Sequence, residues 1–292
     1  MTELRLVPKS KARRAPSTAS RVHYTALPRS AVRTLAVTSG KGGVGKSNVV
    51  ANLAVAMGQL GASVVVVDAD FGHANQDLLL GVNPRVDLLS VLRGECELEH
   101  IVTQGPPGVR LIPAGSGDSR LTELDDVRRE GLLREIGAVA GDADIVLLDT
   151  ASGSSRQVTS LVLAAHEILL VTTPEPTAYA DAYGLLKVLA ALGLATEPGL
   201  VVNSASSPED AEEFAHRLAS VSRRFLRKRL HSLGYLPFDP ALPRSVQKQE
   251  PTVLAYPQCP FAQQMKKLAA WLLERSPDGA PVGATPWDRE CA

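Results

Sequence analysis

Cysteine is scarce in this chain of 292 residues. The three cysteines, Cys96, Cys259 and Cys291, lie far apart and form no C-x-x-C pair. This spacing argues against a disulfide framework, a zinc site and an iron–sulfur scaffold. We therefore expect the protein to work in a reducing cytosol.

Long hydrophobic runs and an excess of one charge are also missing. No apolar stretch approaches the ~18 residues of a transmembrane helix, and the first ten residues, MTELRLVPKS, lack the apolar block of a signal peptide. Because 31 basic residues balance 31 acidic ones, no global field favours a nucleic-acid or membrane partner. We expect a soluble, cytoplasmic protein whose 45% hydrophobic content suffices for a large core.

Short β-branched runs alternate with helical patterns from Thr34 onward. Examples are TLAVTS followed by NVVANLAVAMGQLG, and EILLVTT followed by DAYGLLKVLAALG. This alternation predicts crossover connections and a mostly parallel sheet. The run Val64 to Val67 is apolar on both faces, which is typical of a strand covered by helices on both sides. The sequence thus predicts an α/β fold with a central sheet between two helical layers.

The chain divides into three expected segments. Residues 1–33 have no sustained period and are expected to form a basic, mostly disordered arm. Residues 34–275 form the predicted folded domain, and residues 276–292 a loose tail. The stretch QQMKKLAAWLLER predicts the last helix. Its apolar stripe is expected to belong to the core rather than to a membrane anchor, and consists of Phe261, Met265, Leu268 and Leu272.

A glycine-rich segment between a predicted strand and a predicted helix carries the clearest chemical signal. GKGGVGKS matches the pattern G-x-x-x-x-G-K-[ST]. Its glycines let backbone N–H groups face phosphate oxygens, while Lys46 can reach the β- and γ-phosphates and Ser47 can bind Mg²⁺. The expected nucleotide contacts are Gly40, Lys41, Gly42, Gly43, Val44, Gly45, Lys46, Ser47 and Asn48.

Acidic and amide residues follow other predicted strands. Asp68 and Asp70 end SVVVVDAD, and Asp149 ends DIVLLDT, at the edge where α/β sheets bind ligands. Asn203 in VVNSAS offers a donor and an acceptor to an adenine edge, and the segment Pro237, Phe238 and Asp239 offers a wall for the ring. Each of these features alone also fits a turn at the end of a strand.

The segment KGGVGKS resembles the deviant phosphate-binding loop of the MinD/ParA family of P-loop ATPases. The resemblance implies ATP and Mg²⁺ as cofactors and an ATP-dependent homodimer, in which Lys41 reaches the partner's phosphates as an arginine finger does. It also implies that Asp70 orients the attacking water, and that Asp68 is structural or linked to the Mg²⁺ shell. By the same resemblance, Asp149 contacts Mg²⁺ through water, and Thr150 to Gly153 begin the second switch segment.

The segment TTPEPTAYADAYGLLKVLA is similar to the FlhG branch of this family, which controls flagellar number and placement. The similarity runs from about Thr34 to Glu274. It implies that Glu175 and Asp181 lie near the dimer interface or the ribose. It further implies partners such as the flagellar GTPase FlhF and basal-body or polar proteins.

Three departures from the branch separate this sequence from its relatives. The activator motif D-Q-A-x-x-L-R is missing from residues 1–33, and no second amphipathic helix follows Glu274. Phe71 and His73 replace the usual leucines of the first switch segment, and a lone histidine there is more often packed or solvated than catalytic.

Two basic segments offer contacts with an anionic membrane or with DNA phosphates. A solvated helix face also explains the second segment. The first contains Arg5, Lys9, Lys11, Arg13, Arg14, Arg21, Arg29 and Arg33, and the second, in SRRFLRKRLH, contains Arg223, Arg224, Arg227, Lys228 and Arg229.

Two alternatives to a flagellar regulator stay open. The first is a ParA-like ATPase that positions DNA or other cargo through a basic surface. The second is a metallocluster carrier on the same fold, against which the missing C-x-x-C pair argues. In the flagellar interpretation the protein is cytoplasmic and makes peripheral contact with the inner face of the cell membrane.

Overall fold

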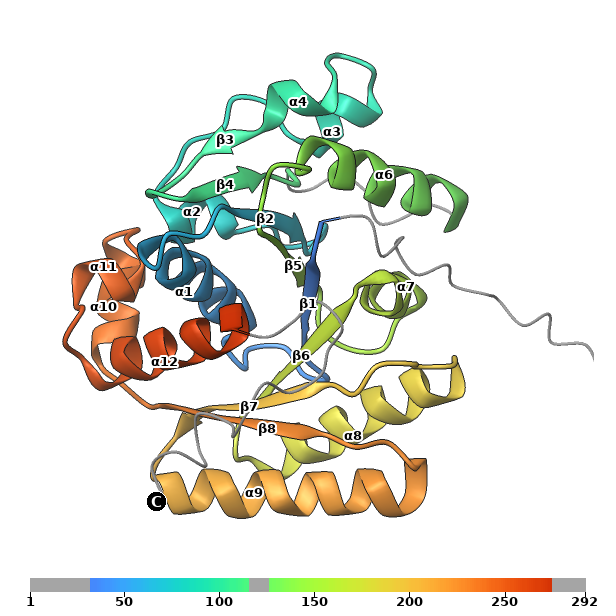
Figure 1. Ribbon diagram of the computed structural model, residues 1–292, viewed down its shortest axis with the longest axis vertical. Coiled ribbons are helices and arrows are strands. Elements are labelled where there is room, and N and C mark those ends of the chain that lie inside the picture. Colours follow the sequence, from blue (N-terminus) through green and yellow to red (C-terminus); the bar gives the residue numbers. More distant parts are fainter. Residues whose placement is uncertain (1–31, 116–125, 275–292) are drawn as a thin grey trace, which may run out of the picture.

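A twisted eight-stranded sheet runs through the centre of the computed structural model, which describes residues 32–115 and 126–274 (Figure 1). The strand order is β3-β4-β2-β5-β1-β6-β7-β8, and only the pair of β3 and β4 is antiparallel among these strands. The predicted α/β architecture is therefore confirmed. The strands are β1 Thr34–Thr38, β2 Val64–Ala69, β3 Thr103–Gln104, β4 Val109–Ile112, β5 Ile145–Thr150, β6 Glu167–Thr172, β7 Gly199–Ala205 and β8 His231–Pro237.

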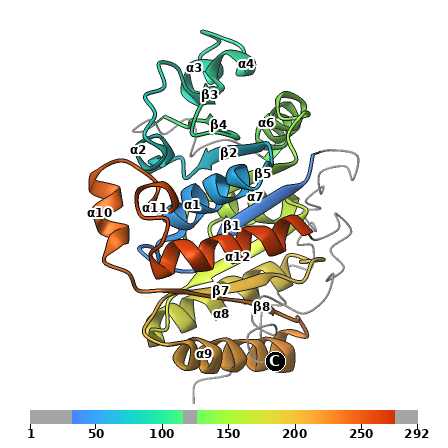
Figure 2. The same ribbon diagram turned by 60° about the vertical axis from the view of Figure 1, so that its left-hand side comes forward.

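Helices cover both faces of the sheet, with α1, α11 and α12 on one side and α6, α7 and α8 on the other (Figures 1 and 2). Two clusters of buried hydrophobic residues lie between the sheet and these two layers. The helices are α1 Lys46–Gln59, α2 Gln76–Leu80, α3 Leu88–Leu92, α4 Leu98–Ile101, α6 Asp126–Val139, α7 Arg156–Ala164, α8 Pro176–Ala191, α9 Pro208–Val221, the π-helix η1 Ser222–Leu226, α10 Ala241–Gln247, α11 Thr252–Ala255 and α12 Pro260–Glu274.

Strand β2 shows how the sequence produces this three-layer arrangement. Successive side chains of a strand point to opposite faces of its sheet. Val64 and Val66 accordingly belong to the cluster beneath α1 and α12, whereas Val65 and Val67 belong to the cluster on the other face. A continuous apolar run is therefore needed here, as the sequence predicts.

Helix α12 closes one face of the sheet by packing beside α1 (Figure 2). The four residues of its predicted apolar stripe are all buried, with at most 3% of their surface exposed. The prediction that this stripe belongs to the core is confirmed. Among the described residues, no helix has both the length and the apolar content that crossing a bilayer requires.

The second basic segment departs from the expected continuous helix. Helix α9 ends at Val221 and is followed by the π-helix η1, after which Arg227 has a φ of 56° in the left-handed region. The Lys228 ammonium turns inward and donates a hydrogen bond to the carbonyl of Leu194. The basic residues after Ser222 are therefore divided between η1, which contains Arg223 and Arg224, and the turn that begins at Arg227.

Most of the predicted arm and tail lie outside the described residues. Arg33, at the end of the expected arm, is described, and its Nε lies 2.5 Å from Glu167 Oε1 at the start of β6. Both side chains of this ion pair are at most 10% exposed. Arg33 is therefore fixed to the folded domain beside the first strand.

Candidate nucleotide-binding site

Sheet register brings two of the predicted carboxylates together at the carboxyl edge of the parallel strands. Asp68 on β2 lies directly opposite Asp149 on β5, and Val37 on β1 is the neighbour of Asp149 on its other side. Thr150 donates from Oγ1 to the carbonyl of Val37 at 3.1 Å. The phosphate-binding loop, which follows β1, therefore starts next to Asp149, with Asp68 one strand further away.

The loop adopts a backbone that its glycines allow. Gly43 and Gly45 have φ values of 79° and 85°, in the left-handed region that side chains other than hydrogen disfavour. A Cβ at Gly45 would also lie 2.4 Å from Nδ2 of Asn203. Because Gly45 directly precedes α1, the loop aims the N-terminus of a 14-residue helix at the site, the arrangement that favours phosphate.

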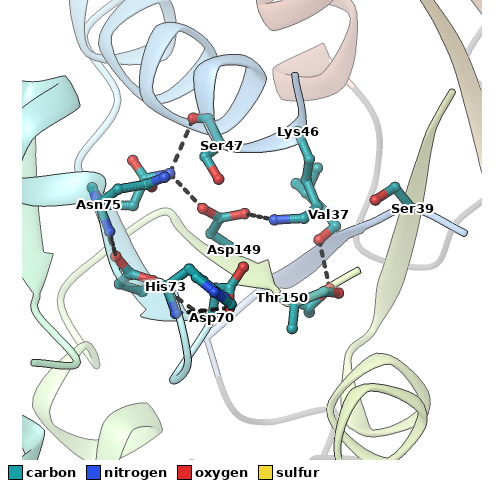
Figure 3. A network of polar contacts seen from close by, with 12 residues as sticks. Val37, Ser39, Lys46, Ser47, Asp70, His73, Asn75, Asp149 and Thr150 are labelled. Atoms are coloured by element: carbon teal, nitrogen blue, oxygen red, sulfur yellow. Dashed lines mark hydrogen bonds and ion pairs between the residues drawn. The ribbon is translucent and has the colours of Figure 1, made fainter. Parts of the chain in front are cut away.

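Lys46 and Asp149 form a buried ion pair at the centre of the site (Figure 3). Lys46 Nζ lies 2.5 Å from Asp149 Oδ1, and the two side chains are 7% and 0% exposed. The other oxygen, Oδ2, accepts a hydrogen bond of 2.7 Å from Nε2 of Gln76. Both oxygens of the predicted metal-binding carboxylate thus have a positively polarised donor.

Asp68 serves the backbone of the first switch segment. Its Oδ2 accepts from the N–H groups of Asn75 and Gln76 at 2.8 and 2.9 Å, and its Oδ1 accepts from the N–H of Asp70 at 3.3 Å. Burial raises the pKa of Asp68 to about 7, the charge of Asp149 adds to the rise, and the three N–H groups oppose it. These contacts give Asp68 a structural part, one of the two roles that the resemblance implies.

Asp70 lies at the outer end of this segment, beside His73 (Figure 3). Its side chain is 18% exposed, and its Oδ1 accepts from the N–H of His73 at 3.2 Å. The His73 side chain is 92% exposed, in line with the solvated alternative, whereas Phe71 is packed in the core. Asp70 can therefore face water while its backbone stays anchored to Asp68.

Lys41 contacts the start of α8, whereas Lys46 contacts Asp149. Its Nζ lies 2.8 Å from Glu175 Oε2 and 2.9 Å from Thr177 Oγ1. The Lys41 ammonium lowers the pKa of Glu175 through this hydrogen bond and its charge. The two predicted residues Lys41 and Glu175 thus lie together on the surface, apart from the buried pair.

The predicted base-binding residues fall into two groups: Asn203 and Asp239 are buried and bind backbone groups, whereas Phe238 is exposed. Asn203 is 2% exposed, and its Nδ2 donates to the carbonyl of Val44 at 2.7 Å, so its amide supports the loop. Asp239 accepts at its two oxygens from the N–H groups of Ala241 and Phe261. Phe238 directly follows β8 and is 70% exposed, so its ring is available for stacking on a base.

Gln76 is the residue that the sequence analysis missed. It is 0% exposed, and its Nε2 donates to the carbonyl of Ser47 at 3.0 Å as well as to Asp149. No motif marks a glutamine at the start of a five-residue helix. Only the three-dimensional contact, across 73 positions of sequence, reveals its place in the site.

These residues suit a nucleotide with Mg²⁺. The Ser47 hydroxyl and the carboxylates of Asp149 and Asp68 are oxygen donors, the type that Mg²⁺ prefers. The buried Oε1 of Gln76 has no hydrogen-bond partner among the described residues, so this oxygen can still accept a hydrogen bond from a bound group. Lys46 and the loop N–H groups supply the positive partners for phosphate.

Comparisons with known proteins agree with this geometry. Residues 35–253 match the family model described as the CobQ/CobB/MinD/ParA nucleotide binding domain. The chain is 39% identical to the antiactivator FleN of Pseudomonas aeruginosa, over 85% of this chain and 90% of that protein. It is 32% identical to the flagellum site-determining protein YlxH of Helicobacter pylori, over 84% and 83% of the two chains.

A solved structure has the same fold. The septum site-determining protein MinD of Pyrococcus horikoshii OT3, in complex with Mg-ADP, superposes with a TM-score of 0.70 at 29% identity. The match covers 84% of this chain and 96% of that one. Together with the family model and the loop geometry, these similarities confirm the family predicted from KGGVGKS. The chain belongs to the CobQ/CobB/MinD/ParA nucleotide-binding family and is a P-loop ATPase of the MinD/ParA type.

Proposed function

We propose that this MinD/ParA-type ATPase regulates the number or the placement of flagella. The observation that carries the proposal is the 39% identity to the antiactivator FleN over most of both chains, which similarity to a flagellum site-determining protein supports. ATP with Mg²⁺ is its nucleotide. The ATP-bound chain forms a homodimer, and hydrolysis returns the monomer. The partners in this proposal are a flagellar GTPase of the FlhF type and basal-body or polar proteins.

Each residue of the site has a part in this cycle. Lys46 leaves Asp149 to neutralise the phosphates, which the loop N–H groups surround. Bound Mg²⁺ supplies charge neutralisation at the transferred phosphoryl group. Asp149 and Ser47 would hold that cation, and Asp70 would orient the attacking water. Lys41 exchanges its contact with Glu175 for the partner's phosphates.

The proposal places the chain in the cytoplasm, in peripheral contact with the inner face of the cell membrane. Residues 34–275 act as the ATPase domain in this scheme. The basic arm and the tail flank it.

Counting flagella tests the biological role directly. A host strain that lacks the chain is expected to show an altered number or position of flagella by electron microscopy. Wild-type protein should restore the normal pattern, whereas Lys46→Ala should not, because Lys46 contacts phosphate. An unchanged flagellar pattern in the deletion strain would contradict the proposal.

A variant of Asp70 tests the cycle in solution. Because water orientation is needed only for the chemical step, Asp70→Ala should bind ATP and accumulate as a dimer. Size-exclusion chromatography with ATP measures this outcome, with the wild-type protein, which returns to a monomer as ATP is consumed, as the control. A monomeric Asp70→Ala protein with ATP bound would remove the assignment of this residue.

A second candidate function rests on the surface around η1. We define the basic corner as Arg223, Arg224, Arg227 and Arg229 together with Phe225. All five side chains are exposed, Phe225 to 63%, and the Arg224 guanidinium lies 5.2 Å from the Phe225 ring centre. The corner precedes β8, which is parallel to β7, so it lies toward the amino ends of these strands, whereas the nucleotide site lies at the carboxyl ends. It supports a ParA-like ATPase that positions DNA through non-specific phosphate contacts.

Salt-dependent DNA binding distinguishes this candidate. The ATP-bound Asp70→Ala dimer should bind random duplex DNA, and Arg223→Ala/Arg229→Ala should weaken binding and flatten its salt dependence. The double variant Arg85→Ala/Lys187→Ala removes the same charge from other exposed positions and serves as the control. Equal weakening by both double variants would argue against the corner as a DNA site.

A further inference from the structure

Gln76 connects three parts of the site that are separate in sequence. Its side-chain Nε2 lies 3.0 Å from the carbonyl oxygen of Ser47 on α1 and 2.7 Å from Oδ2 of Asp149 on β5. Its backbone N–H donates to Oδ2 of Asp68 on β2 at 2.9 Å. A residue at the beginning of α2 therefore bridges the phosphate-binding helix and both carboxylates.

The two side chains that donate hydrogen bonds to Asp149, Lys46 and Gln76, should respond differently when nucleotide binds. Lys46, which holds Oδ1, has to move to the phosphates because a lysine at this loop position binds them. Gln76 carries no charge and has its second contact on the Ser47 carbonyl, so it is not drawn away. Gln76 then remains the donor that holds Oδ2, and Oδ1, released by Lys46, becomes available to a cation.

A second observation connects Gln76 with that site. Its Oε1 is buried without a hydrogen-bond partner among the described residues, although its Nε2 has two. A buried acceptor without a donor is unfavourable. A water of the Mg²⁺ shell near Ser47 and Asp149 would supply this donor, because Mg²⁺ usually keeps several of its waters.

We propose that Gln76 is a positioning residue that orients the Asp149 carboxylate for Mg²⁺ and couples occupation of the cation site to the position of α2. The inference rests on the proposed ATPase function and adds a regulatory path to it. Leu78, two residues further along α2, is 51% exposed. A change at the cation site can thus reach the exposed side of α2.

The experiment separates the cation-dependent part of nucleotide binding from the rest. ADP affinity of the purified full-length chain is measured by calorimetry in Mg²⁺ and again in EDTA, for wild type and for Gln76→Met. Methionine has a similar length and keeps the packing, but it has no N–H to donate. Partners outside the ligand shell typically contribute 10–100-fold to metal affinity. We expect the gain in affinity from Mg²⁺ to fall about tenfold, with the EDTA value within about twofold of wild type.

Hydrogen exchange provides a readout that does not depend on hydrolysis. In wild type, Mg-ADP should slow exchange of the α2 amides more than ADP in EDTA does. In Gln76→Met this difference should disappear. Leu78→Ala, an exposed change in the same helix, should retain both the Mg²⁺ gain and the exchange difference.

Each result decides the matter. An unchanged Mg²⁺ gain in Gln76→Met, or a loss of equal size in Mg²⁺ and in EDTA, would overturn the inference, the second because it indicates a merely structural role. If thermal unfolding shows that Gln76→Met is not folded, Gln76→Leu takes its place with the same criteria. If wild type itself gains no affinity from Mg²⁺, the binding of Mg²⁺ with the nucleotide at this site, on which the proposed function relies, fails instead.

Discussion

The two lysines of the phosphate-binding loop differ sharply in their surroundings. Lys46 is 7% exposed and paired with a fully buried carboxylate, whereas the side chains of the pair Lys41 and Glu175 are 35% and 56% exposed. An exposed ion pair contributes little to stability, because solvent screens it. Breaking a buried pair leaves an uncompensated charge and costs several kcal/mol. Two lysines within six residues of each other therefore have ammonium groups in very different environments.

Alanine substitutions should separate these duties. Lys46→Ala should bind ATP poorly and lose about 3 kcal/mol of unfolding free energy, because Asp149 loses a buried partner. Lys41→Ala should keep its stability and measurable ATP affinity but lose hydrolysis, because the proposed cycle places its main phosphate contact across the dimer. Calorimetry, urea unfolding and phosphate release measure the three quantities.

The difference between Lys46→Ala and Lys41→Ala tests whether the two lysines contact the phosphates of different subunits. Equal loss of ATP binding in both would show that both lysines act within one subunit. Glu175→Gln is the matched control, since it removes the charge that holds Lys41 but leaves the lysine itself. Hydrolysis should persist in that variant.

At the scale of elements, the phosphate-binding loop packs tightly against α8 at Gly40. A Cβ at Gly40 would lie 2.2 Å from the carbonyl oxygen of Asp181, which belongs to the backbone of α8. A Cβ at Gly42 would meet only the Ser152 hydroxyl, at 3.4 Å. Two glycines of the same loop thus tolerate a methyl group very differently. The predicted place of Asp181 near the dimer interface or the ribose stays a prediction, while its backbone carbonyl limits the space at Gly40.

Gly40→Ala should displace the loop from α8 and weaken ATP binding at least tenfold, since the clash involves backbone that cannot rotate away. Gly42→Ala is the matched control and should stay within about threefold of wild type, because its Cβ makes an ordinary contact. Calorimetric titration with ATP and Mg²⁺ compares the two. Similar affinities for both variants would show that α8 moves to accommodate the added methyl.

The elements that the sequence predicts well are those whose signal is local. The runs before Asp68 and Asp149 are apolar on both faces and end in an acidic residue, so both the buried strands and the ligand edge follow from the pattern. Strand β3 has only two residues and pairs antiparallel with β4, too short for any periodicity. The sequence pattern does not predict this strand.

Two other features depend on contacts that no local pattern encodes. The helical pattern of α9 continues into SRRFL, yet the chain forms a π-helix and turns at Arg227. Ser222 Oγ and the Lys228 carbonyl close this turn with a hydrogen bond of 3.0 Å. Gln76 likewise acquires its role only when β5 lies beside β2. Tertiary packing therefore determines both the turn at Arg227 and the contacts of Gln76.

At the scale of the whole molecule, α12 joins the far end of the folded domain to its first helix. Phe261 at its start is 0% exposed and belongs to the cluster shared with α1. The N–H of Val253, on the preceding α11, donates to Oδ1 of Asn52 in α1 at 3.0 Å. The last described segment therefore completes the layer that holds the phosphate-binding helix.

Phenylalanine truncations should report this closure. Phe261→Ala should lower the free energy of unfolding by about 3–5 kcal/mol, the usual cost of removing a buried aromatic side chain. Phe225→Ala is the control, because Phe225 is 63% exposed, and it should change stability by less than about 0.5 kcal/mol. Urea unfolding followed by circular dichroism measures both. Similar losses for the two variants would contradict the described burial.

At the scale of the dimer, two weakly binding basic arms can together hold the protein on an anionic membrane. Near an anionic membrane each Lys or Arg contributes about 1 kcal/mol at most. The predicted arm contains eight basic residues, but Arg33 is already paired with Glu167, which leaves seven. One arm should bind weakly. An ATP-bound dimer presents two arms, and the effective concentration of the second strengthens binding without any new contact.

Deleting residues 1–29 should therefore leave ATP binding and dimerisation intact, because Arg33 and β1 remain, but should abolish recruitment to anionic liposomes at low salt. Co-sedimentation of full-length and truncated Asp70→Ala dimers at two salt concentrations measures this difference, since screening weakens such contacts. Arg223→Ala/Arg229→Ala in the full-length chain is the matched control and should sediment like its parent. Unchanged sedimentation after truncation, with loss in the double variant, would transfer the membrane contact from the arm to the basic corner.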